Sequence, residues 1–342
     1  MYKYYTSIIY TMLNIALFGY GRIGQMHAEN IFNHKDLNLA YVYDKIFNLA
    51  LKSKKKYKNK VIKDYKIALK DKKTDIIFIS SPTSTHLRFI EESVFYRKIV
   101  FCEKPLDLNI KKIKKSIKKL SKNNAKIQLG FNRRYDPGHF SIKRSLKLNK
   151  IGKLQKIIIT SRDPEPPSIE YLKSSGGIFK DMMIHDFDLC RFYLDKDKII
   201  NIFAQTSSFE KFYNKVNDHE LASVVMKSKK GVICVINNSR HSSYGYDQRV
   251  ELFGSKGMLI SGNIKNNETE LYTSNETHSM EPYLNFFIER YQTSYIKQLD
   301  ELVAFAKKNK KPRSVFLDGY KALLLAENAI KSFKSKKLIK IR

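Results

Sequence analysis

The chain has 342 residues and a formal net charge of +31, with 64 lysines and arginines against 33 aspartates and glutamates. This length exceeds what one hydrophobic core usually holds, so two domains are expected. The hydrophobic share of 42% excludes a disordered chain, and no apolar run is long enough to predict a transmembrane helix.

The basic balance first suggests a nucleic acid or an anionic membrane as partner. The lysines, however, are scattered among Asn, Ile, Tyr and Phe, and far outnumber arginine, which reads phosphates and bases with paired hydrogen bonds. In residues 109–122 the apolar positions fit one helix face, so the lysines there form a solvated face. We therefore expect neither nucleic acid nor membrane as a partner, although the charge would ease the approach of a dinucleotide.

A strand is expected directly after Met12, so residues 1–12 are interpreted as an extension that is either disordered or non-native. The extension has no small-residue cleavage site, so it is not interpreted as a signal peptide. Cys102, Cys190 and Cys234 have no metal-binding spacing and sit in apolar surroundings. We expect buried free thiols in a cytoplasmic protein.

Residues 13–32, LNIALFGYGRIGQMHAENIF, contain an apolar strand, a GxGxxG motif and a helical pattern in succession. Gly19 would make the tight turn, Gly21 would let the backbone approach a pyrophosphate, and Gly24 would let the helix pack on the strand. The start of the helix offers free N–H groups and a positive dipole end to phosphates. The predicted contacts of a dinucleotide here are Gly19, Gly21, Arg22, Ile23 and Gly24.

The second predicted strand, residues 37–45, ends at an acid that follows the glycine motif at the expected distance. The carboxylate of this residue, Asp44, could accept both ribose hydroxyls of an adenosine and would repel a 2′-phosphate. This favours NAD over NADP. Lys45 follows directly and is a possible phosphate partner, which leaves NADP open.

Further apolar strands alternate with amphipathic helices up to about residue 132, and this alternation predicts a doubly wound parallel sheet, a Rossmann domain spanning 13–132. Ligands of such sheets bind beyond the carboxyl ends of the strands. Besides the glycine motif, the segments at those ends are 81–83, 103–105 and 132–134. We predict contacts to the cofactor from Ser81, Pro82, Thr83, Glu103 and Lys104, with Pro105 as a candidate cis proline.

After Arg134 the pattern changes to strands joined by short turns such as SKKG (228–231) and GSKG (254–257), followed by long amphipathic helices at 284–308 and 317–335. We predict an α+β domain over 133–342, with a large, open, mostly antiparallel sheet. The cofactor is then expected in the first domain and the substrate between the two.

Residues 176–189, GGIFKDMMIHDFDL, carry several charges among apolar residues. On one helix, Asp181 and His185 would project within about 40° of each other. The alternative is a helix-capping pair with no chemistry. Asp186 and Asp188 are expected to cap, bridge or face solvent. The two glycines would let the chain pass close to a cofactor or a ring.

These motifs together resemble the Gfo/Idh/MocA oxidoreductase family, from Leu13 to about residue 335. The segments that carry the resemblance are the glycine motif, SSPTSTH (80–86), VFCEKPL (100–106) and GFNRRYDP (130–137). Two longer segments, 161–192 and 242–258, resemble its inositol 2-dehydrogenases in particular. The visible departures are the N-terminal extension and the basic surface.

The resemblance implies a catalytic set of a lysine in the EKP turn and an aspartate and a histidine spaced D-x-x-x-H, here Lys104, Asp181 and His185. It also implies His86 near the cofactor NAD, substrate-facing tyrosines at Tyr244 or Tyr246, and a homotetramer assembled through the open sheet face.

Oxidation of a secondary alcohol by NAD needs a hydride acceptor and a base that takes the hydroxyl proton. Histidine titrates near neutral pH without help, so we predict that His185 is the base. Lys104 would polarise the oxygen, and Asp181 would orient His185 and bind a neighbouring hydroxyl. The predicted substrate-binding residues are Lys104, Arg133, Arg134, Asp163, Asp181, His185, Tyr244 and Tyr246.

The function that fits these features best is NAD-dependent oxidation of myo-inositol to its 2-keto product. Three alternatives stay open: a dehydrogenase of scyllo-inositol or of a pyranose sugar, a dinucleotide-sensing regulator, and a nucleic-acid binder. A metal site is not expected, because His219 and His241 are isolated.

Overall fold

The computed structural model describes residues 12–341, so nearly all of the predicted N-terminal extension lies outside the described residues. The chain divides into two compact units. Unit 1 contains the described residues up to Asp107, Lys111–Gly130 and Tyr295–Phe316, and unit 2 contains Leu108–Ile110, Phe131–Ser294 and the residues from Leu317 onward.

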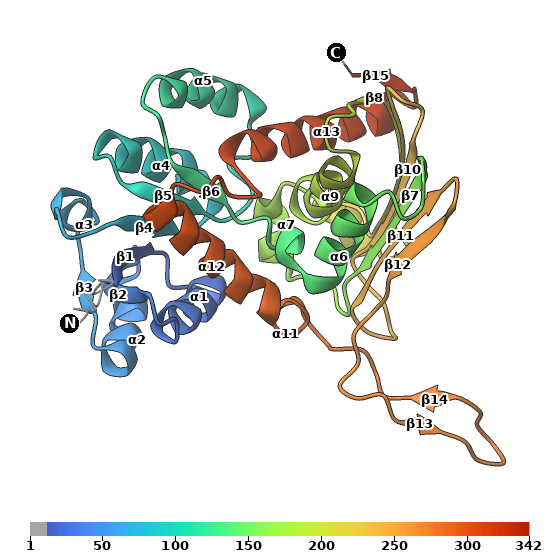
Figure 1. Cartoon of the computed structure of the whole chain (residues 1–342), viewed down its shortest axis with the longest axis horizontal. Coiled ribbons are helices and arrows are strands. Elements are labelled where there is room, and N and C mark those ends of the chain that lie inside the picture. The colour runs from blue at the N-terminus through green and yellow to red at the C-terminus, as the bar shows by residue number, and fades with distance from the viewer. Residues whose placement is uncertain (1–11, 342) are drawn as a thin grey trace, which may run out of the picture. The chain divides into compact units, whose positions relative to one another are not determined.

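Unit 1 is built on a six-stranded, wholly parallel sheet with strand order β3-β2-β1-β4-β5-β6. This confirms the predicted doubly wound Rossmann sheet. The two central strands are almost continuously buried, as helices on both faces require. The strands are β1 Leu13–Phe18, β2 Leu37–Tyr43, β3 Lys60–Ile62, β4 Ile76–Ile79, β5 Ile99–Cys102 and β6 Ile127–Leu129. The helices are α1 Arg22–Phe32, α2 Phe47–Tyr57, α3 Lys66–Lys70, α4 His86–Phe95 and α5 Ile110–Ser121 (Figure 1).

A late segment of the chain returns to unit 1. Helix α12 (Gln292–Lys308) buries Leu299, Leu302 and Val303 in the same core cluster as α1 and the strands of unit 1. The predicted second domain, 133–342, is therefore wrong in this segment. An amphipathic pattern shows that a helix buries one face, but it does not show which sheet that face meets.

Unit 2 is built on a seven-stranded sheet with strand order β12-β11-β7-β10-β9-β8-β15. Only the β7–β10 pair is parallel, so the predicted mostly antiparallel sheet is confirmed. The strands are β7 Leu154–Arg162, β8 Ile199–Ser207, β9 Leu221–Ser228, β10 Ile233–Ser239, β11 Asp247–Gly254, β12 Gly257–Ser261 and β15 Ile339–Lys340. The helices are α6 Pro137–Lys147, α7 Ile169–Ser175, α8 Ile178–Asp181, α9 Ile184–Leu194, α10 Lys211–Lys215, α11 Phe287–Arg290 and α13 Phe316–Ser335.

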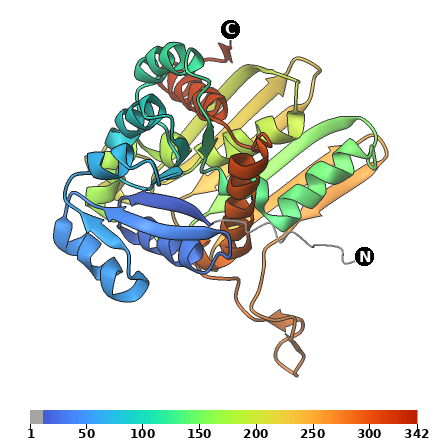
Figure 2. The same ribbon diagram turned by 60° about the vertical axis from the view of Figure 1, so that its left-hand side comes forward.

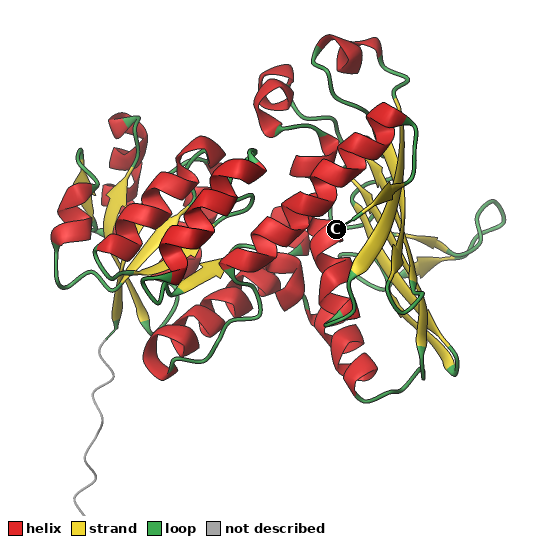
Figure 3. Ribbon diagram, turned by 90° about the horizontal axis from the view of Figure 1, so that it is seen from above, coloured by secondary structure: helices red, strands yellow, loops and turns green. Residues whose placement is uncertain are grey.

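The helices of unit 2 gather on one face of its sheet, and the other face is left open (Figures 1 and 3). Ile157 and Ile159 of β7 point toward the helices and are buried, whereas Ile158 between them is only partly buried. A separate two-stranded hairpin of β13 (Glu270–Leu271) and β14 (Ser279–Met280) follows β12 in the chain.

Cys102, Cys190 and Cys234 are buried free thiols, as predicted. Among residues 12–341, none of the helices has the length and apolar character that crossing a bilayer demands.

A buried charged cluster fixes the start of α6. Asp136 accepts a hydrogen bond from the backbone N–H of His139 at 3.0 Å and pairs with the Arg290 guanidinium at 2.6 Å. The imidazole of His139 is fully enclosed, and its Nδ1 lies 4.0 Å from Asp136. Burial lowers the pKa of His139 to about 4, despite the opposing effect of the Asp136 carboxylate. His139 is therefore neutral in the folded protein at neutral pH.

His139 should make the protein less stable in acid. Below its unfolded pKa of about 6.5 the unfolded chain binds a proton that the folded chain does not bind until about pH 4, so stability falls as pH falls through this window. Between pH 7 and pH 4.5 the loss attributable to His139 is about 2–3 kcal/mol in the free energy of unfolding. Urea unfolding at both pH values should show a smaller loss in His139→Gln than in the unaltered protein; equal losses would remove His139 as the cause.

Candidate active site

The glycine loop after β1 has the geometry that its motif predicts. Gly19 has a φ of +98°, and a Cβ there would lie 2.5 Å from the backbone nitrogen of Ser81. A Cβ on Gly24 would lie 2.1 Å from the carbonyl oxygen of Gly19, so α1 packs on β1 only without a side chain there. Gly21 differs, because a Cβ there would meet no atom within 4 Å. Its backbone faces open space.

Helix α1 begins directly after Gly21, which supplies no side-chain cap. The N–H groups of the first helical turn have no partner within the helix, and they lie at the positive end of its dipole. Arg22 is exposed and Ile23 is partly buried at this turn. An open backbone at Gly21 next to an uncapped helix start fits the pyrophosphate of a dinucleotide.

Asp44 stands beside this loop at the end of β2. Its two carboxylate oxygens accept hydrogen bonds from the backbone N–H groups of Tyr20, at 2.7 Å, and Ile46, at 2.8 Å. The side chain remains partly exposed, and a carboxylate has further acceptor capacity. Asp44 thus holds the glycine loop in place, and its carboxylate can still accept a hydrogen bond from a ribose hydroxyl. Lys45 next to it is exposed.

His86 does not lie where a ligand could touch it. It is 1% exposed, and its ring nitrogens lie 2.7 Å from the carbonyl oxygens of Pro105 and Ser81. Burial lowers the pKa of His86, against the raising effect of those two carbonyls. His86 therefore ties the loop after β4, which carries Ser81, Pro82 and Thr83, to the turn after β5.

The turn after β5 separates two neighbouring charges. The Lys104–Pro105 peptide bond is cis, and Lys104 is only partly buried. The Glu103 carboxylate instead lies 2.7 Å from the buried His27 ring and accepts the backbone N–H of Lys104 at 3.2 Å. Glu103 is held inside unit 1, and a Cβ on Gly130 would come within 2.8 Å of it.

In unit 2 the single helix predicted to carry Asp181 and His185 is interrupted. Helix α8 ends at Asp181, α9 begins at Ile184, and Met182 and Met183 form a turn between them. The backbone N–H of Met183 reaches back five residues to the carbonyl of Ile178 at 2.9 Å, instead of the regular four. The angle expected for a continuous helix therefore does not apply to Asp181 and His185.

Two positive-φ glycines set the start of α8. Gly176 and Gly177 have φ values of +88° and +82°, and a Cβ on Gly176 would lie 2.7 Å from the Leu108 side chain. The backbone N–H of Ile178 donates to Asp218 at 2.7 Å. The glycines are thus explained by backbone conformation and by a close contact within unit 2.

From Asp181 to Cys190 every residue is buried except Asp181 and His185, which are partly exposed. The His185 ring packs edge-on against Phe131, with ring centroids 6.1 Å apart. The α8–α9 element is therefore anchored by apolar residues and presents one carboxylate and one imidazole. This is the arrangement expected of side chains that are used in chemistry.

Two residues that the sequence did not single out hold Asp181. One carboxylate oxygen accepts the hydroxyl of Tyr171 at 2.7 Å, and the other lies 3.2 Å from the guanidinium of Arg240. Arg240 is fully buried and also pairs with Asp218 at 2.9 Å. Burial and the nearby Asp181 carboxylate raise the pKa of Tyr171, so its hydroxyl remains a donor. No motif marks Arg240; only its place at the end of an apolar strand could have drawn attention to it.

Arg133 and Arg134 were predicted to bind substrate, but the structure buries them both. The guanidinium of Arg133 contacts Asp186 at 2.5 Å and Ser161 at 3.0 Å, and Arg134 forms two hydrogen bonds to Asp188, at 2.6 and 2.7 Å. Burial raises the pKa of both aspartates, and the arginines oppose this effect. Of the three roles left open for Asp186 and Asp188, the structure shows bridging, and we do not retain Arg133 and Arg134 as substrate ligands.

The other predicted substrate residues lie at the ends of the unit 2 strands. Asp163 follows β7 and is partly exposed. Tyr244 is 48% exposed, and its hydroxyl receives a hydrogen bond from Arg162 and donates one to Asp247 at 2.6 Å. Tyr246 is 5% exposed, with its ring among other aromatic rings. Tyr244 is therefore the more accessible of the two tyrosines.

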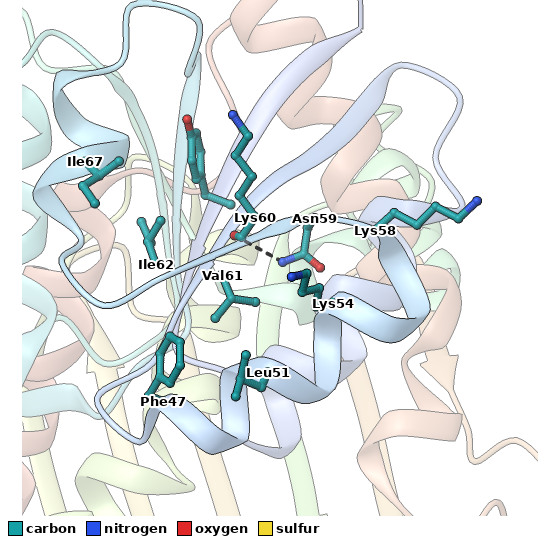
Figure 4. A pocket seen from close by; sticks show the side chains of 10 residues that line it. Phe47, Leu51, Lys54, Lys58, Asn59, Lys60, Val61, Ile62 and Ile67 are labelled. Carbon is teal, nitrogen blue, oxygen red and sulfur yellow. Dashed lines mark hydrogen bonds between the residues drawn. The ribbon is translucent and has the colours of Figure 1, made fainter.

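A separate cavity of about 570 Å³ lies in unit 1 between α2, β3 and α3 (Figure 4). Its lining includes Phe47, Leu51, Ile62 and three lysines, and none of the predicted site residues. Within residues 12–341, His, Cys, Asp and Glu side chains do not converge in threes as metal ligands would.

Comparisons with known proteins agree with the two folds that carry these residues. A sequence model of the oxidoreductase family's NAD-binding Rossmann fold matches residues 13–131, and a model of the GFO/IDH/MocA C-terminal domain matches residues 140–260. A myo-inositol 2-dehydrogenase of Thermotoga maritima is 37% identical over 331 residues, which cover 96% of this chain and 98% of that protein.

Solved structures of inositol dehydrogenases are also similar to this chain in fold. The myo-inositol dehydrogenase of Corynebacterium glutamicum has a TM-score of 0.93 and 36% identity, covering 97% of this chain and 99% of its own. The scyllo-inositol dehydrogenase of Lactobacillus casei, solved with NAD(H) and scyllo-inositol, has a TM-score of 0.90 and 25% identity, covering 96% and 99%.

Removing the Arg240 guanidinium should destabilise unit 2 strongly. Arg240→Met leaves Asp181 and Asp218 without their shared buried cation, at a cost of about 3–5 kcal/mol in the free energy of unfolding. Tyr171→Phe removes only one hydrogen bond to Asp181 and should cost about 1 kcal/mol. Urea unfolding followed by circular dichroism measures both. The exposed Arg144, changed to Met, is the matched control and should stay within about 0.5 kcal/mol; an Arg240→Met result in that range would contradict the pairing.

Proposed function

The chain belongs to the GFO/IDH/MocA oxidoreductase family, and we propose that it oxidises myo-inositol to its 2-keto product as an NAD-dependent inositol 2-dehydrogenase. It is an NAD-dependent oxidoreductase, and the glycine cradle with Asp44 fits that cofactor. The observation that carries the proposal is the α8–α9 element, on which Asp181 and His185 alone remain accessible from Asp181 to Cys190.

The proposed chemistry assigns the proton to His185. NAD, when bound, supplies the acceptor for the hydride that leaves the carbon. His185 takes the proton of the hydroxyl on that carbon, because an imidazole can accept a proton at neutral pH. Its edge-on contact with Phe131 limits the orientations of the ring. Lys104 is proposed to donate a hydrogen bond to the same oxygen and so to stabilise its developing negative charge.

The proposed role of Asp181 follows from its contacts. Asp181 accepts a hydrogen bond from the Tyr171 hydroxyl and lies against the Arg240 guanidinium, so its carboxylate is held in place and is suited to accept a further hydrogen bond from a substrate hydroxyl. We assign it to a hydroxyl next to the reacting carbon and to the orientation of His185. Asp163 and Tyr244, both accessible at strand ends, are proposed to bind further ring hydroxyls, and Tyr246 is proposed to support Tyr244. A polyhydroxylated ring needs several such partners, because each buried hydroxyl without one is costly.

A second candidate substrate is scyllo-inositol, which is bound in the similar Lactobacillus casei enzyme. The two cyclitols differ in the orientation of one hydroxyl. The choice between them, or a pyranose sugar, is expected to depend on side chains such as Asp163 and Tyr244 that meet the ring away from the reacting carbon.

We also propose a cytoplasmic homotetramer that binds neither nucleic acid nor membrane. The open face of the unit 2 sheet supports the assembly. Register aligns Ile260, Ile158, Val235, Val225 and Phe203 into one apolar row across that face, interrupted only by Glu251. Val225 is 45% and Ile260 60% exposed. An apolar row of this extent is typical of a protein interface.

The test of function is turnover of a cyclitol panel. The protein is mixed with NAD and, in turn, myo-inositol, scyllo-inositol and pyranose sugars, and absorbance of reduced nicotinamide is followed. The proposal predicts the highest kcat/KM for myo-inositol. Higher kcat/KM for scyllo-inositol would favour the second candidate. Binding of NAD without turnover of any substrate would point instead to a dinucleotide-sensing regulator.

His185→Ala and Asp44→Ala should separate chemistry from cofactor binding. Loss of the general base should lower kcat by about 100-fold or more with the NAD dissociation constant unchanged. Asp44→Ala should raise the NAD dissociation constant by about tenfold or more, with a much smaller effect on the affinity for inositol. Steady-state kinetics and titration of NAD measure both. A normal kcat in His185→Ala would refute its role as base.

A further inference from the structure

A long hairpin projects from unit 2. Residues 264–283, here called the arm, join β12 to α11 and contain the short strands β13 and β14 (Figure 1). Leu271 is 51% exposed and Tyr272 is 59% exposed on it. A two-stranded hairpin is only marginally stable by itself in water, so an arm with exposed apolar residues is suited to a surface that covers it.

The arm differs in charge from the rest of this basic chain. Residues 266–289 form the longest stretch of the sequence without a lysine or arginine. The arm carries Glu268, Glu270, Glu276 and Glu281 against Lys265 alone. Lys265 lies 3.4 Å from Glu268, and Glu270 faces His278 across the hairpin at 3.2 Å. An acidic arm on a chain of charge +31 calls for a basic partner surface.

Such a surface lies on the open face of the unit 2 sheet, beside the apolar row described above. The strand register places Met258, Phe253, Lys156, Ile233, Lys227, Asn201 and Lys340 in one line across all seven strands. The three lysines, here called the lysine row, are exposed. Within residues 12–341, none of these three lysines forms an ion pair. Phe253 and Met258, exposed by 47% and 49%, lie in the same line.

We propose that the arm of one copy docks on the lysine row of a second copy of this chain. Its glutamates pair with Lys156, Lys227 and Lys340, and Leu271 and Tyr272 cover apolar side chains such as Phe253. This inference rests on the homotetramer proposed above, and it names the arm as the element that determines how two copies pack. It does not depend on the chemistry of Asp181 and His185.

The positions of arm and lysine row along the sheet suit a two-fold arrangement. The arm leaves β12 after Ser261, whereas the lysine row crosses β12 at Met258. The two are therefore roughly 10 Å apart along the strand. When two open faces pack with their strands running in opposite directions, each arm comes to the end of the sheet where the other copy has its lysine row. A two-fold interface repeats the contact, so each pair forms twice.

A charge swap tests the docking on the full chain. Glu268→Lys with Glu276→Lys reverses the charge at two positions of the arm. Lys156→Glu with Lys227→Glu reverses the charge at two positions of the lysine row. By sedimentation velocity, each pair alone should raise the dissociation constant of the assembly about tenfold or more, less so at high salt. The four substitutions together should restore it to within about threefold of the unaltered protein. Lys114→Glu with Lys118→Glu on the exposed face of α5 is the matched control and should change nothing.

The outcomes separate this inference from the others. A monomeric unaltered protein at micromolar concentration would overturn both the docking and the tetramer, and leave the arm for a different partner. Unchanged assembly in both reversed proteins would overturn the docking alone. Weakened assembly without rescue would show that arm and row act on different surfaces. A well-assembled protein that turns over no cyclitol would contradict the dehydrogenase and leave the docking intact.

Discussion

Carboxylates held by buried arginines from other elements determine how unit 2 is built. Asp181 meets Arg240, Asp186 meets Arg133 and Asp188 meets Arg134. Asp186 and Asp188 are fully buried, and neither could stay there unpaired, because desolvating an unpaired charge costs several kcal/mol. Together, the three pairs require that α8, α9, the segment 131–136 and the ends of β7 and β10 come together in one arrangement. The helix that carries His185 is positioned by the Asp186–Arg133 and Asp188–Arg134 pairs, which take no part in the proposed chemistry.

The sequence predicted the fold well because fold depends on patterns that repeat. Apolar strands alternating with amphipathic helices lead to a parallel sheet wherever they occur, and short glycine-containing turns lead to hairpins. The role of each glycine in the loop was predictable, since Gly19 and Gly24 are required by steric contacts between residues that are close in the sequence. The assignment of α12 failed, because its partner strands lie almost the whole chain away.

The candidate site was only partly predictable, for a related reason. A motif shows which residues belong together, but not which of them face the ligand. His86, Glu103, Arg133 and Arg134 all lie in motifs at strand ends, and each is turned inward to a carbonyl, an imidazole or a carboxylate. Arg240 and Tyr171 lie outside every motif, yet they hold Asp181. Burial and pairing are properties of three-dimensional packing. Only the structure therefore shows which residues could contact a ligand and which hold other residues in place.

Helix α12 has a consequence for how this protein is made. Unit 1 begins with the first strand, but its core also contains Leu299, Leu302 and Val303, which follow the whole of the unit 2 sheet except β15. Domains usually fold in the order in which the ribosome releases them. Here the nascent N-terminal unit must wait with part of its apolar surface uncovered until nearly the entire chain has emerged. The unit that is started first is among the last to be finished, and the two units mature together rather than in sequence.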